Sequence, residues 1–114
     1  MNEPSFAAQL AEDLGPADLR HVLEVFGRDV ARLTGVLREA AAGDDAIGFR
    51  RAAHGLAGAA GAVGARALEQ ECRKAMAQAE TKLGELSATM STIDVLAEDA
   101  MRELARFVAA LDAS

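Results

Sequence analysis

The sequence predicts an all-α fold, an antiparallel up-down four-helix bundle with an additional short helix at the N-terminus. Apolar residues recur at intervals of three and four along most of the chain, which is the period of an amphipathic helix. Strand signals are nearly absent, because the sequence has no sustained polar–apolar alternation and no Asn-Gly or Asp-Gly hairpin turn. Short connections between long helices make neighbours antiparallel. With 114 residues, the chain suffices for a single domain over residues 1–114 and is too short for two.

The first two helices are separated by a stop signal and a start signal. A short helix is expected from Pro4 to Asp13, and it ends at Gly15-Pro16, where glycine closes one helix and proline opens the next. The second helix is expected from about Ala17 to Ala42, with Gly43 closing it. The apolar stripe of this second helix consists of Leu19, Leu23, Phe26, Val30, Leu33 and Leu37.

The third helix is expected from about Asp45 to Gly61. Either Asp44 or Asp45 can cap its start, because both carboxylates can accept free backbone N–H groups. A turn at residues 61–64 then leads into a fourth helix. The apolar stripe of that fourth helix consists of Leu68, Cys72, Ala75, Ala79 and Leu83.

The last helix is evident from Ile93 to Leu111, over which the apolar stripe is continuous. Its start is open. The Ser and Thr residues within 84–92 favour a turn, whereas Leu86 and Met90 continue the helical period. We place the loop at residues 85–91.

Composition restricts the class of partner and the compartment. The formal net charge of −6 argues against a nucleic-acid partner, because a polyanion demands clustered cations. No apolar run reaches the roughly 18 residues needed to cross a bilayer, so we expect no membrane association. Residues 1–4 lack the basic start of a secretory signal. The single cysteine, Cys72, cannot form an internal disulfide and fits a reducing compartment, so a cytoplasmic protein is expected.

One face of the expected third helix presents a histidine to solvent. At about 100° per residue, five apolar residues fall within an arc of about 80°, which is therefore expected to face the core: Phe49, Ala53, Leu56, Ala60 and Val63. His54 lies well outside that arc. Its neighbours on the outward face are Ile47, Arg50, Arg51, Ala57, Gly58 and Gly61. The imidazole is therefore expected to be exposed, between two arginines and residues with little or no side chain.

This arrangement suits a nucleophile that carries an anionic group. An unperturbed imidazole is mostly neutral at pH 7 and offers a ring-nitrogen lone pair. Arg50 and Arg51 precede His54 by four and three residues and can stabilise a phosphoryl group there. A helix-interior glycine costs about 0.5 to 1 kcal/mol, and bare backbone at Gly58 leaves room for a second molecule. The alternative is a surface histidine in an alanine-rich helix whose glycines reflect composition, and spacing alone does not decide between the two.

A resemblance separates these alternatives. The segment from Arg50 to Gly64 resembles the signature of histidine phosphotransfer (HPt) domains, whose pattern is close to A-H-x-L-K-G, then a glycine and L-x-x-x-C. The residues that match this pattern are Ala53, His54, Leu56, Gly58, Gly64, Leu68 and Cys72. Upstream, Phe26-Gly27-Arg28-Asp29 is similar to the F-x-x-D helix of the family, and the Gly43-Asp44 turn matches as well. The resemblance covers about residues 18 to 80.

The resemblance implies a phosphocarrier without kinase or phosphatase activity of its own. It implies that His54 takes a phosphoryl group from the aspartate of one receiver domain and gives it to the aspartate of another. The partners would be a hybrid sensor kinase and response-regulator receivers of a two-component phosphorelay of bacterial signalling. By position, Gly58 is the residue that lets the receiver approach. The domain would hold no cofactor and no metal, with Mg²⁺ on the receiver, and would be a monomer so that this face stays accessible.

One departure from the family pattern concerns the residue three positions after the histidine. The family usually has lysine there, and this chain has Ala57, so Arg50 or Arg51 would have to replace the missing cation. We assign Ile47, Ala57 and Gly61 to partner docking. Ile47 has a second interpretation, in which it packs against the first helix.

Two other functions remain as alternatives. The first is an HPt-like docking module that binds a receiver or kinase without efficient transfer, and Ala57 is the feature that favours it. The second is a hydrolytic or metal-dependent enzyme, which lacks a second catalytic group and a ligand cluster in the sequence. His21 lies opposite the apolar stripe of its helix and is expected on the surface, whereas Cys72 is expected in the core.

Overall fold

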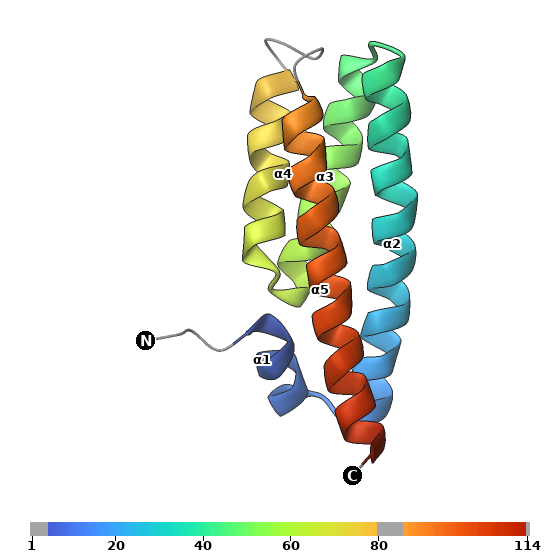
Figure 1. Cartoon of the computed structure of the whole chain (residues 1–114), viewed down its shortest axis with the longest axis vertical. Coiled ribbons are helices and arrows are strands. Elements are labelled where there is room, and N and C mark those ends of the chain that lie inside the picture. Colours follow the sequence, from blue (N-terminus) through green and yellow to red (C-terminus); the bar gives the residue numbers. More distant parts are fainter. Residues whose placement is uncertain (1–4, 80–85, 114) are drawn as a thin grey trace.

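The structure is a bundle of four long helices with a short helix against one end (Figure 1). It is a computed structural model that describes residues 5–79 and 86–113. The helices are α1 (Phe6–Asp13), α2 (Pro16–Ala42), α3 (Ala46–Val63), α4 (Arg66–Ala79) and α5 (Ser87–Ala113). Each long helix packs on the next, and α5 returns to α2. These described ranges contain no strand, so the predicted all-α bundle with its additional N-terminal helix is confirmed.

Two predicted boundaries were wrong. Helix α3 continues to Val63 rather than ending at Gly61, and α5 begins at Ser87, so the loop predicted for 85–91 is helical over 87–91. Two tertiary contacts stabilise the start of α5. Met90 is buried in the core, and the hydroxyl of Thr89 donates a hydrogen bond to Gln78 Oε1 of α4 at 2.6 Å. The predicted positions that lie outside the described residues are Pro4, Leu83 and residue 85.

Both ends of α3 are fixed by local chemistry. At the start, Asp45 Oδ1 accepts a hydrogen bond from the Gly48 N–H at 2.9 Å, which confirms the predicted cap. At the end, Gly64 has φ +89°, a left-handed conformation that side chains resist. The Ala65 N–H donates to the Ala60 carbonyl at 2.9 Å and closes the last turn. Only two residues, Gly64 and Ala65, separate α3 from α4, which runs back alongside it.

The core combines a few large side chains with many alanines. The largest fully buried side chains are Phe49, Leu19, Leu37, Leu56, Leu68, Leu86, Ile93, Leu104 and Cys72. Several alanines, including Ala53, Ala60 and Ala75, are fully buried, so the helices approach one another closely. Cys72 lies in the core as predicted. Burial, and secondarily the charge of Glu71, raises the pKa of its thiol to about 12.

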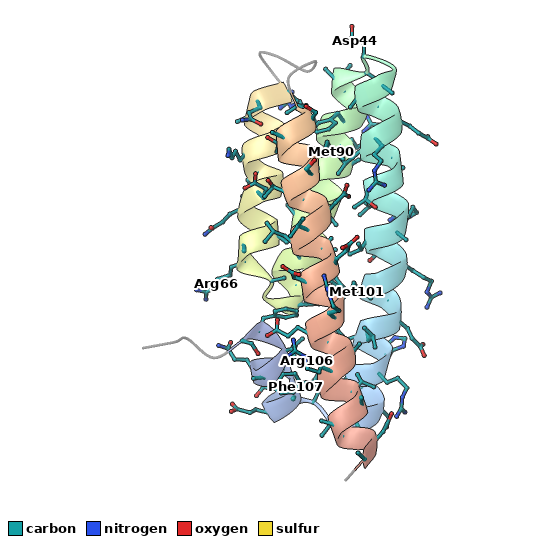
Figure 2. The ribbon with its side chains drawn as sticks, viewed as in Figure 1. Asp44, Arg66, Met90, Met101, Arg106 and Phe107 are labelled. Carbon is teal, nitrogen blue, oxygen red and sulfur yellow. The ribbon has the colours of Figure 1, made fainter. Side chains whose placement is uncertain are left out.

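Helix α1 lies at the end of the bundle far from the α2–α3 turn. Figure 2 shows Asp44 at one end and Phe107 beside α1 at the other. Ala7 of α1 is fully buried, and Phe6 approaches Gly64 in the α3–α4 turn. Within the described part of the chain, no helix combines the length and the apolar character that crossing a membrane requires.

Candidate functional site

The outward face of α3 carries most of the site residues expected from the sequence. His54 is exposed midway along the helix, and Gly58 and Gly61 are exposed on the same side. Arg50 and Arg51 are exposed one turn earlier. The face therefore lies on a single rigid element, whose two ends are fixed by Asp45 and Gly64.

Ala57 was expected on this outward face, and that placement was wrong. The structure buries it, with 2% of its surface exposed. Ala57 lies about 60° from His54 around the helix axis, on the side of the core, and small side chains let α4 pack closely enough to cover it. The surface beside His54 is therefore formed by the backbone around Gly58 rather than by the methyl group of Ala57.

Ile47 is the most exposed large apolar side chain of the described residues, at 72%. The interpretation that it packs against the N-terminal helix is wrong, because Ile47 lies in the first turn of α3 near Asp44, at the opposite end from α1 (Figure 2). Its side chain is therefore accessible from solvent on the His54 side of α3. His21 is exposed, as predicted.

The ring of His54 has no partner within the described residues. No hydrogen bond or ion pair involves either ring nitrogen in the ranges 5–79 and 86–113. Neither nitrogen is therefore held in an internal contact, and the tautomer is not fixed by the fold. An external electrophile can approach the ring without displacing a protein group.

The glycines of this face differ in what surrounds them. A Cβ built on Gly55 would meet Leu33 of α2 at 3.4 Å, and one on Gly61 would meet Glu69 Oε2 of α4 at 2.9 Å. A Cβ on Gly58 would meet nothing within 4 Å. At Gly61 the flexible end of Glu69 would have to shift, whereas no atom of the described residues crowds position 58. Because helix-interior glycine costs about 0.5 to 1 kcal/mol, Gly58 is a stability cost without an internal cause.

Two parts of the site were not identified in the sequence. One is the pair on α4 formed by Arg73 Nη2 and Glu69 Oε2 at 2.9 Å, beside Gly61. In the sequence this pair is an acidic residue followed four residues later by a basic one. That spacing is common on helix surfaces and does not predict which helix lies beside the pair.

The other part is an exposed edge of α2. Gly27 faces Met101 of α5. Val25 and Val36 are each 39% exposed. Val25 lies two residues before Gly27, which faces α5, and Val36 lies two residues before Arg38, which pairs with Asp94 of α5. Two residues correspond to about 200° around a helix, so both valines lie away from α5, on the side where α2 adjoins α3.

The model of the Hpt domain family matches residues 21–114. The chain belongs to this family. The resemblance seen in the sequence is thereby confirmed. Hpt domains in general take part in histidine phosphotransfer in phosphorelays, as phosphocarriers rather than kinases or phosphatases. They interact with receiver domains and kinases. Searches of curated proteins and of solved structures found no match.

Metal chemistry has no candidate site in the part of the chain that the structure describes. There, no group of three or more His, Cys, Asp and Glu residues is placed to hold an ion.

Proposed function

We propose that this Hpt domain is a phosphocarrier that takes a phosphoryl group from the aspartate of one receiver domain onto His54 and delivers it to the aspartate of another. The observation that carries the proposal is Gly58, a helix-interior glycine with open space around it, one turn from an exposed histidine without a partner. A receiver that brings its aspartate to His54 must cross the α3 backbone at that point. A side chain at position 58 would stand in its way.

The transfer step is a displacement at phosphorus. An unprotonated ring nitrogen of His54 attacks the aspartyl phosphate, the N–P bond forms as the O–P bond breaks, and the aspartate leaves as a carboxylate. The second transfer is the reverse step with a different carboxylate as nucleophile. Both steps are governed by positioning and charge, which the receiver supplies together with its Mg²⁺.

The charge of α3 supports this function. The helix contains two arginines and no acidic residue from Ala46 to Val63, in a protein whose net charge is −6. Helix α3 itself is therefore positively charged in an acidic protein. We assign Arg50 and Arg51 to attraction of the acidic receiver site and to stabilisation of the phosphoryl group.

Docking is assigned to the apolar surface beside His54. Ile47 and Gly61 remain in this assignment, and Val36 joins it from α2. The expected partners are a hybrid sensor kinase and response-regulator receivers, in the cytoplasm, with the carrier acting as a monomer.

The competing function is a docking module without efficient transfer. It is favoured by Ala57, because the cation that the family usually places there is absent and the position is buried. The two functions differ in one observable, which is whether His54 becomes phosphorylated.

The experiment incubates the chain with a phosphorylated receiver from a hybrid kinase of the same organism. The expected result is an acid-labile, alkali-stable phosphoryl group on the wild type and on His21→Gln, and none on His54→Gln. His21 is the matched control because it is also an exposed histidine on a helix. Binding of receivers without any phosphoryl transfer to the wild type would establish the docking module instead.

A further inference from the structure

The outward face of α5 carries a stripe of exposed residues with the spacing of a packed helix face. They recur at alternating intervals of four and three residues and fall within about 80° around the helix axis: Ser91, Val95, Glu98, Arg102, Ala105 and Ala109. This alternation is typical of a helix that packs against a second helix. All six residues are exposed, so the described part of the chain leaves the stripe uncovered.

Val95 is the projecting apolar residue of this α5 stripe. Its side chain is 55% exposed, and among the described residues of α5 it is the only large apolar residue that is exposed. A single exposed valine is ordinary on a protein surface. Its significance therefore depends on what the other end of the stripe offers.

A hollow of about 670 Å³ lies beside that other end, between α2 and α5. Much of its lining is apolar, with Leu23 and Val30 from α2 and Met101 and Ala105 from α5. Figure 2 shows Met101 on α5, and a Cβ on Gly27 of α2 would lie 2.9 Å from its Cε, so the two helices are in contact there. The hollow is thus apolar surface that the bundle leaves open to solvent.

The projecting valine and the hollow are related by symmetry. Val95 and Ala105 are each five positions from residue 100, on either side of it. When two copies of α5 lie antiparallel about a two-fold axis at that level, Val95 of each copy meets Ala105 of the other, beside the hollow. Ser91 and Ala109 meet about the same axis, and their small side chains let the helices approach closely.

The charges of the stripe have the same symmetry. Glu98 and Arg102 are each two positions from residue 100, so antiparallel copies place each of them opposite the other. A parallel arrangement would instead place like charges together. Within one chain, Arg102 Nη2 lies 3.9 Å from Glu98 Oε2 and 3.2 Å from Asp99 Oδ1, and these side chains are exposed. Such exposed pairs are weak, so the side chains are available to a second copy.

We propose that the α5 stripe is a self-association surface, through which two copies of this chain pair antiparallel with Val95 of each in the hollow beside Ala105 of the other. Contact along one helix is small for a stable dimer, so the pair is expected to dissociate on dilution. Helix α5 packs on α2 and α4, and α3 lies across the core from it (Figure 1). His54 stays accessible in each copy, which therefore acts as a carrier on its own. The accessibility for which a monomer was expected is thereby kept.

The test is the particle mass by sedimentation equilibrium, over a concentration series that extends to about 1 mM and so reaches dissociation constants of that order. The wild type is expected to shift from monomer toward dimer over this series. Val95→Asp is expected to weaken association by about tenfold or more, because it brings a charge to an apolar hollow. Val25→Asp is the matched control, since Val25 is also an exposed valine and lies away from α5.

Exchange of the two charges tests the antiparallel geometry. Glu98→Arg alone places cations opposite one another at two points of the pair, and Arg102→Glu alone places anions there. Each is expected to weaken association by about three- to tenfold. The double variant Glu98→Arg/Arg102→Glu restores opposite charges across the two-fold axis and is expected to associate as the wild type does. Thermal unfolding at low concentration verifies that every variant is folded.

A wild type that stays monomeric over the whole series would overturn the proposal. A double charge variant that associates no better than the single variants would overturn it as well, as would equal association of Val95→Asp and the wild type. These results are independent of phosphoryl transfer. Failure of the proposed function would appear instead as absence of phosphorylation on His54.

Discussion

Gly58 provides a prediction in which stability and function move in opposite directions. The Gly58→Ala change adds a methyl group that meets nothing within 4 Å, so it relieves the cost of a helix-interior glycine without creating a clash. The free energy of unfolding is expected to rise by about 0.5 to 1 kcal/mol. For a domain of this size, that corresponds to an increase in the unfolding midpoint of roughly 2 to 6 °C.

The neighbouring glycines supply the controls. Gly55→Ala places its methyl group 3.4 Å from Leu33, an ordinary contact, and is expected to stabilise similarly. Gly61→Ala requires Glu69 to move, because its Cβ would lie 2.9 Å from Oε2, so its gain is expected to be smaller. Urea unfolding followed by far-UV circular dichroism measures all three variants, and an unchanged m value shows that stability alone has changed.

The functional half of this prediction uses a larger side chain. Gly58→Gln keeps the helix and adds bulk where the receiver has to approach, so phosphoryl transfer is expected to slow by about ten- to a hundredfold. Gly55→Ala, which points toward α2, is expected to transfer as the wild type does. A Gly58→Gln variant with wild-type transfer rates, or a Gly58→Ala variant less stable than the wild type, would refute the explanation of this glycine.

Two further predictions follow from single positions. Gly64→Ala is expected to destabilise the protein by about 1 to 2 kcal/mol in urea unfolding, because φ is +89° there. The Cys72 thiol is expected to resist alkylation in the native protein and to react once unfolded. Because folding raises its pKa from 9.0 to about 12, its contribution to stability is present below pH 9 and is lost as the pH rises toward 12.

Most of the fold could be predicted because helical periodicity is a local property. Gly15-Pro16 and Gly43 mark helix ends, because glycine favours the conformations that close a helix and proline favours those that open one. Both residue types are recognised directly in the sequence. The start of α5 could not be predicted this way. Its Ser and Thr residues favour a turn. The segment is nevertheless helical, because the helix buries the side chains of Met90 and Ile93 in the core, which is a tertiary effect.

The sequence likewise predicts the parts of the candidate site that depend on one helix, and not those that depend on packing between two helices. Periodicity places His54 outward, since its angle around α3 depends on that helix alone. It does not place Ala57, whose burial depends on how closely α4 packs beside it. It also cannot place Glu69 of α4 against Gly61 of α3, because that contact depends on the register set by the short turn at Gly64. Residues at the border between two helices are thus the ones that a single helical wheel misassigns.

The most direct test of the carrier function is a two-receiver relay in which the chain is present in much smaller amount than either receiver. A phosphorylated donor receiver and an unphosphorylated acceptor receiver are mixed, and the phosphoryl group on the acceptor is followed over time. The expected result is that catalytic amounts of wild-type chain move many equivalents of phosphoryl group, whereas His54→Gln moves none. Transfer that is equally fast with His54→Gln, or receivers that bind the chain without any exchange, would contradict the carrier function.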